Sequence, residues 1–560
     1  MIERYLPHTD FSSYEDFKAH YAVNVPPRFN FAYDVVDGWA EQDDAKPALV
    51  WMDDQDHIQR YSFGELKRLS NQAANLLAAQ GIRKGDVVML ILRQRPEVWI
   101  TMLALNKIGA VVIPASFLLT AKDIVYRVKA ADIRMIVAVD DAEILAHLME
   151  ALPDCPKSLT CAIVGGNVPD GFLDYRAELE KASPEWEKPA DFAGGNDPML
   201  IYFSSGTTGM PKMILHDCTH PLGHIVTAKY WQHVEEGGLH LTASDSGWAK
   251  FGWGKIYGQW ICGAVVAAYD TNKFDPLHML HVMETLQLTT FCAPATLYRF
   301  LIKEDLAKYD FSSIKQCSIA GEPLNPEVFN QWKKLTGMEL VEGFGQSETS
   351  VLIANFGWDP IKPGSTGMFS PLYDAEIVDE NGRPCEDGVV GRIVVRHTDK
   401  RHPLGLFREY YRDPAAMAAS WPAGTYDTGD MAWRDGDGYI WFVGRSDDII
   451  KCSGYRIGPF EVESALMEHP SVLECAVTAA PDPTRGQVVK ATIVLAKGRG
   501  YEPCDELVRE LQDHVKRITA PYKYPRLIEF VDALPKTASG KIRHSAIRQQ
   551  SGNEAPPAKN

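Results

Sequence analysis

Apolar positions in the first part of the chain alternate between helical spacing and short strand-like runs. After Ser62, which opens the capping-box sequence SFGE, apolar residues recur every three or four positions up to Gly81 and predict a helix. Apolar runs at 87–92, 111–115 and 135–139 predict strands, and helical patterns separate them. This alternation predicts a parallel sheet with crossover helices.

The pattern changes twice further along the chain. Between residues 360 and 448, β-branched and aromatic runs are broken by Gly and Asp, which predicts β-hairpins. After Lys451 a compact α+β pattern begins, and residues 505–518 have the spacing of an amphipathic helix. We therefore predict an α/β fold in three parts: a large N-terminal α/β body of several subdomains, one of them β-rich, over 1–446; a small mobile α+β C-terminal domain over 447–550; and a disordered tail over 551–560.

Composition and charge narrow the classes of function. Hydrophobic residues make up 45% of the chain and charged residues 23%, as in ordinary soluble globular proteins. The N-terminus has no basic segment followed by an apolar one, and no apolar run approaches the roughly 18 residues that span a bilayer. The formal charge of -17 argues against a nucleic-acid-binding surface. We expect a cytoplasmic protein with no membrane span and no nucleic-acid partner.

Acidity and cysteines add two further points. Almost all of the negative charge lies in residues 1–446, whereas the segment from Lys516 to Arg543 is rich in Lys and Arg. That segment can attract a small polyanion, or it can be an ordinary solvated basic face. The ten cysteines form no CxxC pair of the kind that indicates zinc or dithiol chemistry, so we expect reduced thiols.

The strongest local signal is SSGTTGMPK at residues 204–212, directly after an apolar strand. Glycines let the backbone turn its amides toward an anion, hydroxyls add donors and Lys212 adds charge, so the segment predicts a phosphate-binding loop. It is no Walker A loop, because Lys212 follows Pro211 and the GK[ST] ending is missing. The alternative, an ordinary Ser/Gly turn, is disfavoured by the uninterrupted run of such residues.

A second cluster, EGFGQSET at residues 342–349, places the acid Glu348 among small and hydroxyl residues. A carboxylate in this setting can hold Mg²⁺ on a triphosphate, because magnesium takes few protein oxygens and leaves room for phosphate. The alternatives are a surface turn and a nucleophile elbow, and the elbow fails because the final Gly of GxSxG is missing. No GxGxxG follows a strand, so dinucleotide-dependent redox chemistry has no support.

Three histidines, His216, His220 and His224, recur at intervals of four residues. On a continuous helix they would line one face like metal ligands, but Pro221 disfavours that helix and no acidic partner stands at HExxH spacing. Ordinary polar packing is therefore the favoured interpretation.

Three more stretches complete an ordered set of motifs: YDTGD at 426–430, GRSDDIIKCSGYRIGPFEVE at 444–463 and PKTASGKIR at 535–543. With these five motifs in order, the sequence resembles the adenylate-forming superfamily of acyl-CoA synthetases, peptide-synthetase adenylation domains and firefly-type luciferases, over roughly residues 30–548. It looks most like the medium-chain acyl-CoA synthetases. The particular cues are GWAKFGWGKIYGQW at 247–260, PDPTRGQVVKA at 481–491 and APYKYPR at 520–526.

The resemblance implies roles for individual residues. The catalytic residues would be Lys541, Glu348 and Lys212, with Glu348 as the Mg²⁺ ligand and Asp447 as the hinge between the domains. The residues implied for ATP are Ser204, Ser205, Gly206, Thr207, Thr208, Gly209, Lys212, Gly321, Glu322, Pro323, Glu342, Gly343, Phe344, Gly345, Gln346, Ser347, Asp430, Arg445 and Lys541. Those implied for CoA are Ser453, Gly454, Tyr455, Arg456, Arg485, Lys516 and Tyr524.

The implied acyl pocket comprises Trp248, Phe251, Trp253 and Gly345. Acetyl-CoA synthetases have a Trp where this chain has Gly345, so the resemblance implies a more open floor that admits longer, branched or aromatic acids. The alternative for the three aromatic residues is a buried core strand. Two departures from the family pattern, Phe344 for the usual Tyr and Ser347 for Thr, should leave activity intact.

The implied reaction is activation of a medium-chain, branched or aromatic carboxylic acid by ATP to acyl-AMP and pyrophosphate, followed by transfer of the acyl group to CoA and release of AMP. Alternatives within the same fold are an aryl (benzoate-type) acid-CoA ligase, a luciferase-type oxidase that does not use CoA, and a nucleotide-binding regulatory protein without turnover. The expected partners are the small molecules ATP, acid and CoA, with Mg²⁺ as cofactor. A homodimer, and a lysine acetyltransferase or deacetylase acting on Lys541, are candidate partners.

Overall fold

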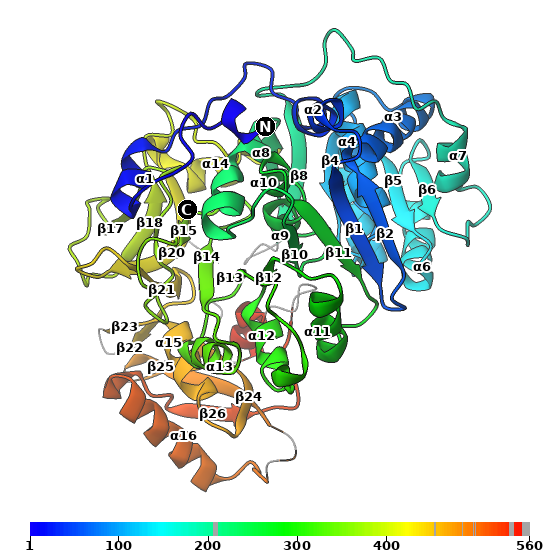
Figure 1. Ribbon diagram of the computed structural model, residues 1–560. Helices are drawn as coiled ribbons and strands as arrows, with labels where there is room; N and C mark the ends of the chain where they lie inside the picture. Colours follow the sequence, from blue (N-terminus) through cyan, green and yellow to red (C-terminus); the bar gives the residue numbers. More distant parts are fainter. Residues whose placement is uncertain are drawn as a thin grey trace.

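The computed structural model describes residues 1–204, 211–452, 455–483, 485–496, 498, 500–536 and 542–550. Within these residues four β-sheets form, three in the N-terminal part of the chain and one in the C-terminal part (Figure 1). Two short helices, α1 (Tyr14–His20) and α2 (Gly38–Gln42), precede the first strand. None of the described helices is long and apolar enough to cross a bilayer.

The eight-stranded sheet confirms the predicted alternation of strands and helices. In spatial order its strands are β19 (Glu409–Tyr410), β9 (Lys212–Asp217), β8 (Pro198–Ser204), β4 (Val111–Pro114), β3 (Val87–Ile91), β5 (Ile133–Val139), β6 (Thr160–Val164) and β7 (Leu173–Asp174). Its helices are α3 (Phe63–Ala79), α4 (Glu97–Ile108), α5 (Ala121–Ala131), α6 (Ala142–Ala151) and α7 (Tyr175–Lys181).

Both faces of this sheet are buried. Successive side chains of a strand point to opposite sides, so each strand contributes to two cores. Val88 and Leu90 of β3 belong to the core that contains α3 and α4, whereas Val87, Met89 and Ile91 belong to the core that contains α5 and α6. Strand β3 runs parallel to β4 and β5, with one helical layer on each face, which is the predicted crossover arrangement.

Local sequence signals set the ends of these helices. The Ser62 side chain accepts a hydrogen bond from the Glu65 amide and the Glu65 carboxylate accepts one from the Ser62 amide, so the predicted capping box begins α3. Thr120 and Asp123 begin α5 in the same way. Helix α4 ends at Gly109, whose φ of 84° lies in the left-handed region that glycine adopts without strain.

The nine-stranded sheet carries most of the candidate site. In spatial order its strands are β16 (Met368–Phe369), β15 (Ile353–Ala354), β14 (Leu340–Phe344), β13 (Gln316–Ala320), β12 (Thr290–Ala293), β10 (Leu239–Thr242), β11 (Val265–Asp270), β1 (Pro47–Asp53) and β2 (Ile58–Ser62). Its helices are α8 (His220–Gly223), α9 (Ala249–Gly254), α10 (Tyr257–Ile261), α11 (Pro276–Thr285), α12 (Ala295–Leu301) and α13 (Pro326–Thr336). Strands β12, β13 and β14 run parallel, so their carboxyl ends, which lead to residues 294, 321 and 345, meet at one edge.

The third sheet confirms the hairpins predicted between 360 and 448. Its strands are β17 (Ala375–Val378), β18 (Gly391–Val395), β20 (Tyr426–Arg434) and β21 (Ile440–Arg445), and α14 (Pro414–Ser420) lies beside them. All neighbouring pairs are antiparallel. The register of β20 and β21 places Asp430 opposite Arg445.

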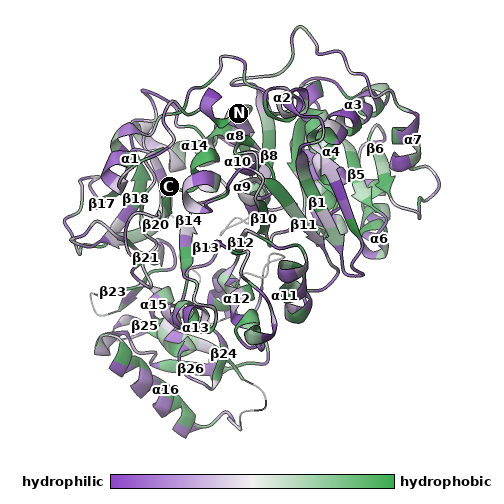
Figure 2. Cartoon of the chain, in the orientation of Figure 1, coloured by the Kyte–Doolittle hydropathy of each residue, from purple (hydrophilic) through white to green (hydrophobic). Residues whose placement is uncertain are grey.

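The C-terminal part has its own sheet and core. The strands are β23 (Tyr455–Ile457), β22 (Ile450–Cys452), β25 (Gly486–Leu495), β24 (Val472–Asp482) and β26 (Leu527–Phe530), with α15 (Pro459–Met467), α16 (Asp505–Ile518) and α17 (His544–Gln550). Helix α16 covers the predicted range, and Figure 2 shows its alternating apolar and polar faces. Leu507, Leu511 and Val515 are its buried residues. The predicted α/β architecture with a small C-terminal α+β part is thus confirmed.

Candidate active site

The segment predicted to bind phosphate connects two antiparallel strands. Ser204 ends β8, Lys212 begins β9, and the two residues are paired across the sheet. The intervening Ser205, Gly206, Thr207, Thr208 and Gly209 lie outside the described residues. The Lys212 ammonium lies 4.5 Å from the centre of the Tyr410 ring, so the cation is held at the mouth of this hairpin.

Glu348 is a buried carboxylate on the segment that follows β14. The Tyr410 hydroxyl donates a hydrogen bond of 2.9 Å to Glu348 Oε1, and the Phe407 amide donates one of 2.7 Å to the Glu348 carbonyl. Burial raises the pKa of Glu348, while Lys212 acts in the opposite direction. Tyr410, which orients the carboxylate and contacts Lys212, was not identified from the sequence, because no motif surrounds it.

Asp430 forms the centre of a second buried polar group. The Gln346 amide nitrogen donates to Asp430, and Arg445 Nη1 lies 3.5 Å from Asp430 Oδ1. Burial raises the pKa of Asp430, which is only 3% exposed, to about 6. The Tyr426 hydroxyl donates to Gln346 Oε1 at 2.6 Å, so both ends of the Gln346 amide are held. The network fixes Asp430 in place next to the loop that carries Glu348.

The segment after β13 forms one wall of the nucleotide region. Gly321 has a φ of 96°, and the Glu322 carboxylate accepts hydrogen bonds from the Thr296 amide at 3.1 Å and hydroxyl at 2.7 Å. Glu342, which was also expected to line the adenine, directs its carboxylate to the Leu324 amide at 3.1 Å. Burial raises the pKa of Glu342 to about 8. Glu342 therefore holds the 321–324 loop.

Gly343 and Phe344 are the last two residues of β14, and each packs against an aromatic ring. A Cβ atom on Gly343 would lie 2.4 Å from the Trp231 ring, so only glycine allows this approach. The Phe344 ring packs against Phe442 with 5.5 Å between the ring centres. Ser347 accepts a 2.8 Å hydrogen bond at its carbonyl from His216 Nε2, which positions the segment before Glu348.

A cavity of about 340 Å³ lies between the N-terminal body and the C-terminal part. Its lining from the body includes Thr296, Arg299, Gly321, Glu322, Pro323, Phe442 and Arg445, and from the C-terminal part Pro459, Phe460, Glu463, Ser464, Met467, Lys536, Ile542 and His544. Lys541 lies outside the described residues, but Lys536 and Ile542 on either side of it line this cavity.

A second cavity of about 440 Å³ adjoins the first, and the two share Thr296, Gly321 and Glu322. Among its lining residues are Phe117, Leu118, Ala243, Asp245, Trp248, Ala249, Lys250, Trp253, Leu297, Gly345, Gln346 and Ser347. It has the size and the apolar walls of a small-molecule site. Phe117 and Leu118 follow β4, and no motif in the sequence identifies them.

Of the aromatic residues expected to line the acyl pocket, Phe251 and Trp253 lie on helix α9 and Trp248 directly precedes it, rather than all three lying on the alternative core strand. Trp248 and Trp253 line the cavity, whereas Phe251 is fully buried and packs against Trp99 at 5.1 Å between ring centres. A Cβ atom on Gly345 would lie 2.4 Å from the Trp253 ring. The space beside Gly345 is therefore taken by the Trp253 indole.

The residues expected to meet CoA lie away from both cavities. Lys516 lies 4.4 Å from the centre of the Tyr524 ring, and the exposed Tyr455 stacks on Tyr522 at 4.1 Å. Arg456 forms an ion pair with Glu380 of the N-terminal body. The Arg485 amide donates a hydrogen bond of 2.8 Å to Asp482 Oδ1. Ser453 and Gly454 lie outside the described residues.

Asp447, the expected hinge, is held from two sides. Arg445 Nε lies 3.6 Å from Asp447 Oδ1, and Arg548 of α17 donates to the Asp447 carbonyl at 3.3 Å and pairs with Asp448. These contacts tie the end of α17 to the junction between the two parts of the chain.

The three spaced histidines pack against one another. The His216 and His220 rings lie 3.9 Å apart, and His220 Nε2 lies 3.1 Å from His224 Nε2. Burial lowers the pKa of His216 to about 4 and that of His224 to about 3, so both are neutral at pH 7. The short helix α8 begins at His220, after β9, so the three histidines do not share one continuous helix, and they show the polar packing that the sequence favoured.

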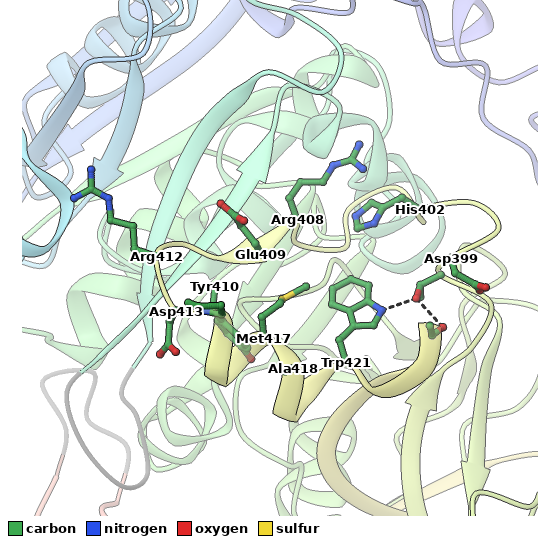
Figure 3. Close-up of a pocket in the computed structure, with 13 residues that line it drawn as sticks. Asp399, His402, Arg408, Glu409, Tyr410, Arg412, Asp413, Met417, Ala418 and Trp421 are labelled. Carbon is green, nitrogen blue, oxygen red and sulfur yellow. Dashed lines mark hydrogen bonds between the residues drawn. The ribbon is translucent and has the colours of Figure 1, made fainter.

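A more open cavity of about 600 Å³ lies between β19 and α14 (Figure 3). Arg408, Arg412, Asp399 and Asp413 give its lining both signs of charge. Tyr410 belongs to the same lining while its hydroxyl binds Glu348, so this cavity lies beside the buried carboxylate.

Buried carboxylates and a cationic hairpin at the carboxyl ends of a parallel sheet, beside a small-molecule cavity, define a nucleotide-using α/β enzyme. Comparison with known families gives the same class. The family described as "AMP-binding enzyme" matches residues 36–411, and "AMP-binding enzyme C-terminal domain" matches 461–541. The chain belongs to the AMP-binding enzyme family, and the predicted membership of the adenylate-forming superfamily is confirmed.

Individual relatives cover nearly the whole chain. "Acyl-coenzyme A synthetase ACSM3, mitochondrial" of Rattus norvegicus is 42% identical over 97% of this chain and 94% of its own length. "Acyl-coenzyme A synthetase ACSM4, mitochondrial" of Mus musculus is 43% identical over 95% of this chain and 92% of its own. These relatives have the activity that the sequence predicted.

Two solved structures are also similar. The anthranilate CoA ligase AuaEII, in complex with anthranoyl-AMP, matches with a TM-score of 0.86 and 26% identity over 94% of this chain and 98% of its own. A benzoate CoA ligase from Burkholderia xenovorans LB400 matches with a TM-score of 0.80 and 25% identity over 93% of this chain and 100% of its own.

Proposed function

We propose that this protein is an acyl-CoA synthetase that converts a carboxylic acid, ATP and CoA to acyl-CoA, AMP and pyrophosphate. The observation that carries the proposal is the continuity of two cavities at Thr296, Gly321 and Glu322. One is lined by both the N-terminal body and the C-terminal part and includes the charged residues Glu322 and Arg445, and the other has Phe117, Trp248 and Trp253 in its walls. An acyl-adenylate has two parts that suit two joined cavities, a charged nucleotide and an apolar acyl group.

The residues of the site suit the nucleotide. An ionised Asp430 offers two acceptor oxygens for the ribose hydroxyls, and Arg445 beside it favours the ionised form. Lys212 and the hydroxyl-rich segment 204–209 suit the phosphates. Gly321, Glu322 and Pro323 suit the adenine edge. We therefore retain these residues as the ATP site.

Mg²⁺ fits the carboxylate at Glu348. Burial raises the pKa of this group, and a buried carboxylate is stabilised in its ionised form by a cation. A carboxylate oxygen is a hard ligand, and magnesium keeps most of its positions for water and phosphate, so one protein ligand suffices. Bound there, the ion would neutralise charge on the phosphate oxygens.

In the first half-reaction an oxygen of the substrate carboxylate attacks the α-phosphorus of ATP, and pyrophosphate leaves. Negative charge builds up on phosphate oxygens in this step, and the ammonium groups of Lys212 and Lys541 are assigned to stabilise it. In the second half-reaction the CoA thiol loses its proton, its sulfur attacks the acyl carbonyl and AMP leaves. Lys541 has no role in this second step.

One arrangement of the two parts cannot serve both half-reactions. Lys536 and Ile542, the described residues on either side of the Lys541 segment, line the nucleotide cavity, whereas Arg456 is paired with Glu380 and does not line that cavity. We propose that this is the arrangement for adenylation, and that residues 447–550 rotate about Asp447 relative to residues 1–446 before the CoA step. The CoA-facing set would then be Ser453, Gly454, Tyr455, Arg456, Arg485, Lys516 and Tyr524.

The acid is assigned from the second cavity. Its volume of about 440 Å³ and its walls of Trp248, Trp253, Phe117 and Leu118 favour a medium-chain or branched acyl group. An aryl acid is the second candidate, because the structural neighbours named for anthranilate and benzoate share the fold over nearly the whole chain.

Compartment and partners remain predictions. The cytoplasm is the predicted compartment, although the curated relatives named above are mitochondrial. A homodimer and a lysine acetyltransferase or deacetylase acting on Lys541 are proposed from the resemblance. Acetylation would remove the charge of Lys541 and should stop adenylation.

The test is AMP formation from ATP and Mg²⁺ with a panel of acids: acetate, butyrate, 2-methylbutyrate, octanoate, benzoate and anthranilate. We expect AMP release that depends on CoA and is greatest for acids of four or more carbons. Pyrophosphate and acyl-product formation without any need for CoA would point to an oxidase of the luciferase type. ATP binding without turnover on any acid would favour a regulatory protein.

A further inference from the structure

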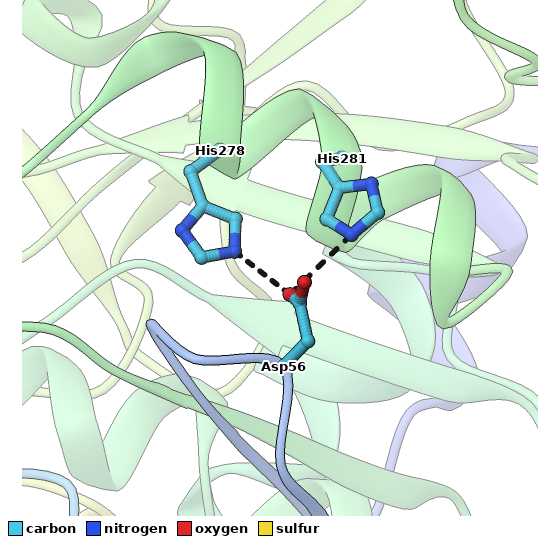
Figure 4. A group of neighbouring side chains, drawn as sticks. All are labelled: Asp56, His278 and His281. Atoms are coloured by element: carbon cyan, nitrogen blue, oxygen red, sulfur yellow. Dashed lines mark hydrogen bonds and ion pairs between the residues drawn. The ribbon is translucent and has the colours of Figure 1, made fainter.

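A loop and a helix far from the nucleotide region bring two histidines to one carboxylate (Figure 4). Asp56 lies in the turn between β1 and β2, with a φ of 63°. His278 and His281 lie one turn apart on α11 and both point toward Asp56. His278 Nε2 is 3.0 Å and His281 Nε2 is 3.4 Å from the same atom, Asp56 Oδ1.

These separations match the spacing of ligands around a tetrahedral metal ion. Zn²⁺ binds imidazole nitrogen and carboxylate oxygen at about 2.0–2.1 Å, so neighbouring ligand atoms are roughly 3.3 Å apart. All three ligand atoms lie within 4.8 Å of one another, and no other group of three His, Cys, Asp or Glu residues in the described part of the chain does so. The shape of the cluster already suits one ion.

The second nitrogen of the His278 ring is engaged. The Tyr269 hydroxyl lies 3.0 Å from His278 Nδ1. Partners on the second nitrogen fix ring orientation and tautomer at metal sites. With its Nδ1 held in this way, His278 directs Nε2 toward Asp56. The Thr285 hydroxyl lies beside the His281 ring, 3.3 Å from Nδ1 and 3.4 Å from Nε2.

The convergence on Asp56 differs from other histidine–carboxylate contacts of the surface. A histidine meets a carboxylate singly in the pairs of His20 with Asp16 and His57 with Asp53. At Asp56 two imidazole nitrogens converge on one oxygen. This oxygen can accept hydrogen bonds from both rings, and the same three atoms can bind one cation through the lone pairs of the two Nε2 atoms.

We propose that Asp56, His278 and His281 bind a borderline divalent ion, with Zn²⁺ as the chemical type, and leave its fourth position open to solvent. Two nitrogen ligands and one oxygen suit zinc and related transition metals, whereas Mg²⁺ prefers oxygen ligands alone. The site is thus distinct in chemistry from the one at Glu348. The bound ion joins the β1–β2 turn to α11.

The experiment titrates Zn²⁺ into the full-length protein, freed of metal by dialysis against a chelator, and measures heat. The variants are Asp56→Asn and His281→Ala, and His57→Ala is the matched control because it removes an exposed histidine of the same turn. We expect one equivalent of Zn²⁺ to bind to the unaltered chain and to His57→Ala, and at least ten-fold weaker binding in the other two variants.

A second readout separates this site from zinc bound by cysteines or other histidines. Zn²⁺ is expected to raise the melting temperature of the unaltered chain and of His57→Ala, and to leave Asp56→Asn unchanged. Co²⁺ should give the absorption of a site with nitrogen and oxygen ligands that is absent in Asp56→Asn. Equal zinc binding and equal stabilisation in all four proteins, or no binding at all, would overturn the proposal.

Discussion

The nucleotide-facing and CoA-facing regions are built in opposite ways. Asp430 and Glu348 are carboxylates whose partners, Gln346 and Tyr410, are themselves held by neighbouring groups. The residues proposed to face CoA are more exposed, and Arg456 is paired with Glu380. In the proposed mechanism the first region is preorganised for its substrate, whereas the second needs a rearrangement.

The difference follows from where each region lies in the fold. The nucleotide region is formed by parallel strand ends and by a hairpin of the third sheet, whose backbones are fixed by ladders of hydrogen bonds. The CoA-facing residues lie on strands, turns and a helix of a separate small core that meets the body at few points. One such point is the hydrogen bond from Asn325 to the Ser464 carbonyl at 3.1 Å. A movable part can expose different surfaces to one fixed site.

The largest expected effect is that of Lys541→Ala. Loss of a charge assigned to the α-phosphate step should reduce acyl-adenylate formation by on the order of 10²–10³-fold. Acyl-CoA formation from a preformed acyl-adenylate should be nearly unchanged. The measurement is pyrophosphate release without CoA, compared with thioester formation from the adenylate. Equal losses in the two half-reactions would contradict the proposal that Lys541 acts only in adenylate formation.

Glu348→Gln should reduce turnover by on the order of 10²-fold, because the carboxylate is assigned to the metal on the triphosphate. Turnover should be partly restored at a higher Mg²⁺ concentration, because the variant is expected to have a lower affinity for the metal. Tyr410→Phe is the matched variant, since it removes one hydrogen bond and keeps the ring beside Lys212. Its loss should be about ten-fold or less. A larger loss in Tyr410→Phe than in Glu348→Gln would contradict these roles.

Asp430→Asn should raise the KM for ATP by roughly ten- to one-hundred-fold, because hydrogen bonds to a charged acceptor are worth about 1.5–3 kcal/mol. The pKa of Asp430 is raised to about 6, so the carboxylate gains its proton as the pH falls through that value. The kcat/KM for ATP should therefore fall below pH 6 in the unaltered enzyme. In the Asn variant, whose side chain does not titrate in this range, the kcat/KM for ATP should not fall below pH 6. Identical pH profiles would exclude Asp430 as the titrating group.

Arg456→Ala should raise the KM for CoA by about ten-fold and leave pyrophosphate release unaffected, if the residue meets CoA only after rotation. Glu380→Ala is the matched control, because it breaks the same ion pair and keeps the arginine. The KM for CoA should be unchanged or lower in that variant. An equal rise in both variants would show that the ion pair itself, and not contact with CoA, is responsible.

The smallest expected effect is on stability. A Cβ atom at position 345 would lie 2.4 Å from Trp253 and 2.6 Å from the Ser350 carbonyl, so Gly345→Ala should cost about 1–3 kcal/mol in the free energy of unfolding. It should also shift acid preference toward shorter chains. Gly436→Ala, with no atom within 4 Å of the added carbon, should stay within about 0.5 kcal/mol. Denaturant unfolding of both variants provides the measurement.

Sequence patterns were sufficient for elements whose signals are local. The capping box at Ser62 and the amphipathic spacing over 505–518 predict helices that the structure has, because each depends on residues within a few turns. The five motifs also supply most of the residues that we propose for the nucleotide site, because their residue types follow from the chemistry of phosphate and ribose.

The residues that sequence reasoning missed are set by distant contacts. Tyr410 reaches Glu348 across 62 positions, and Phe117 enters the second cavity from another sheet. No pattern indicated that Phe251 would pack against Trp99 while Trp248 and Trp253 line the cavity, because α9 has only six residues. Similarly, the hydrogen bond from the Leu324 amide to the Glu342 carboxylate depends on the register of two strands.

The most direct test measures the two half-reactions separately in the unaltered enzyme, Lys541→Ala and Arg456→Ala, with octanoate as the acid. The account predicts a crossed result. Lys541→Ala loses pyrophosphate release and retains thioester formation from octanoyl-AMP, whereas Arg456→Ala retains pyrophosphate release and forms the thioester with a raised KM for CoA. If both variants lose the same half-reaction, or if the unaltered enzyme forms no octanoyl-CoA, the assignment of two separate surfaces is contradicted.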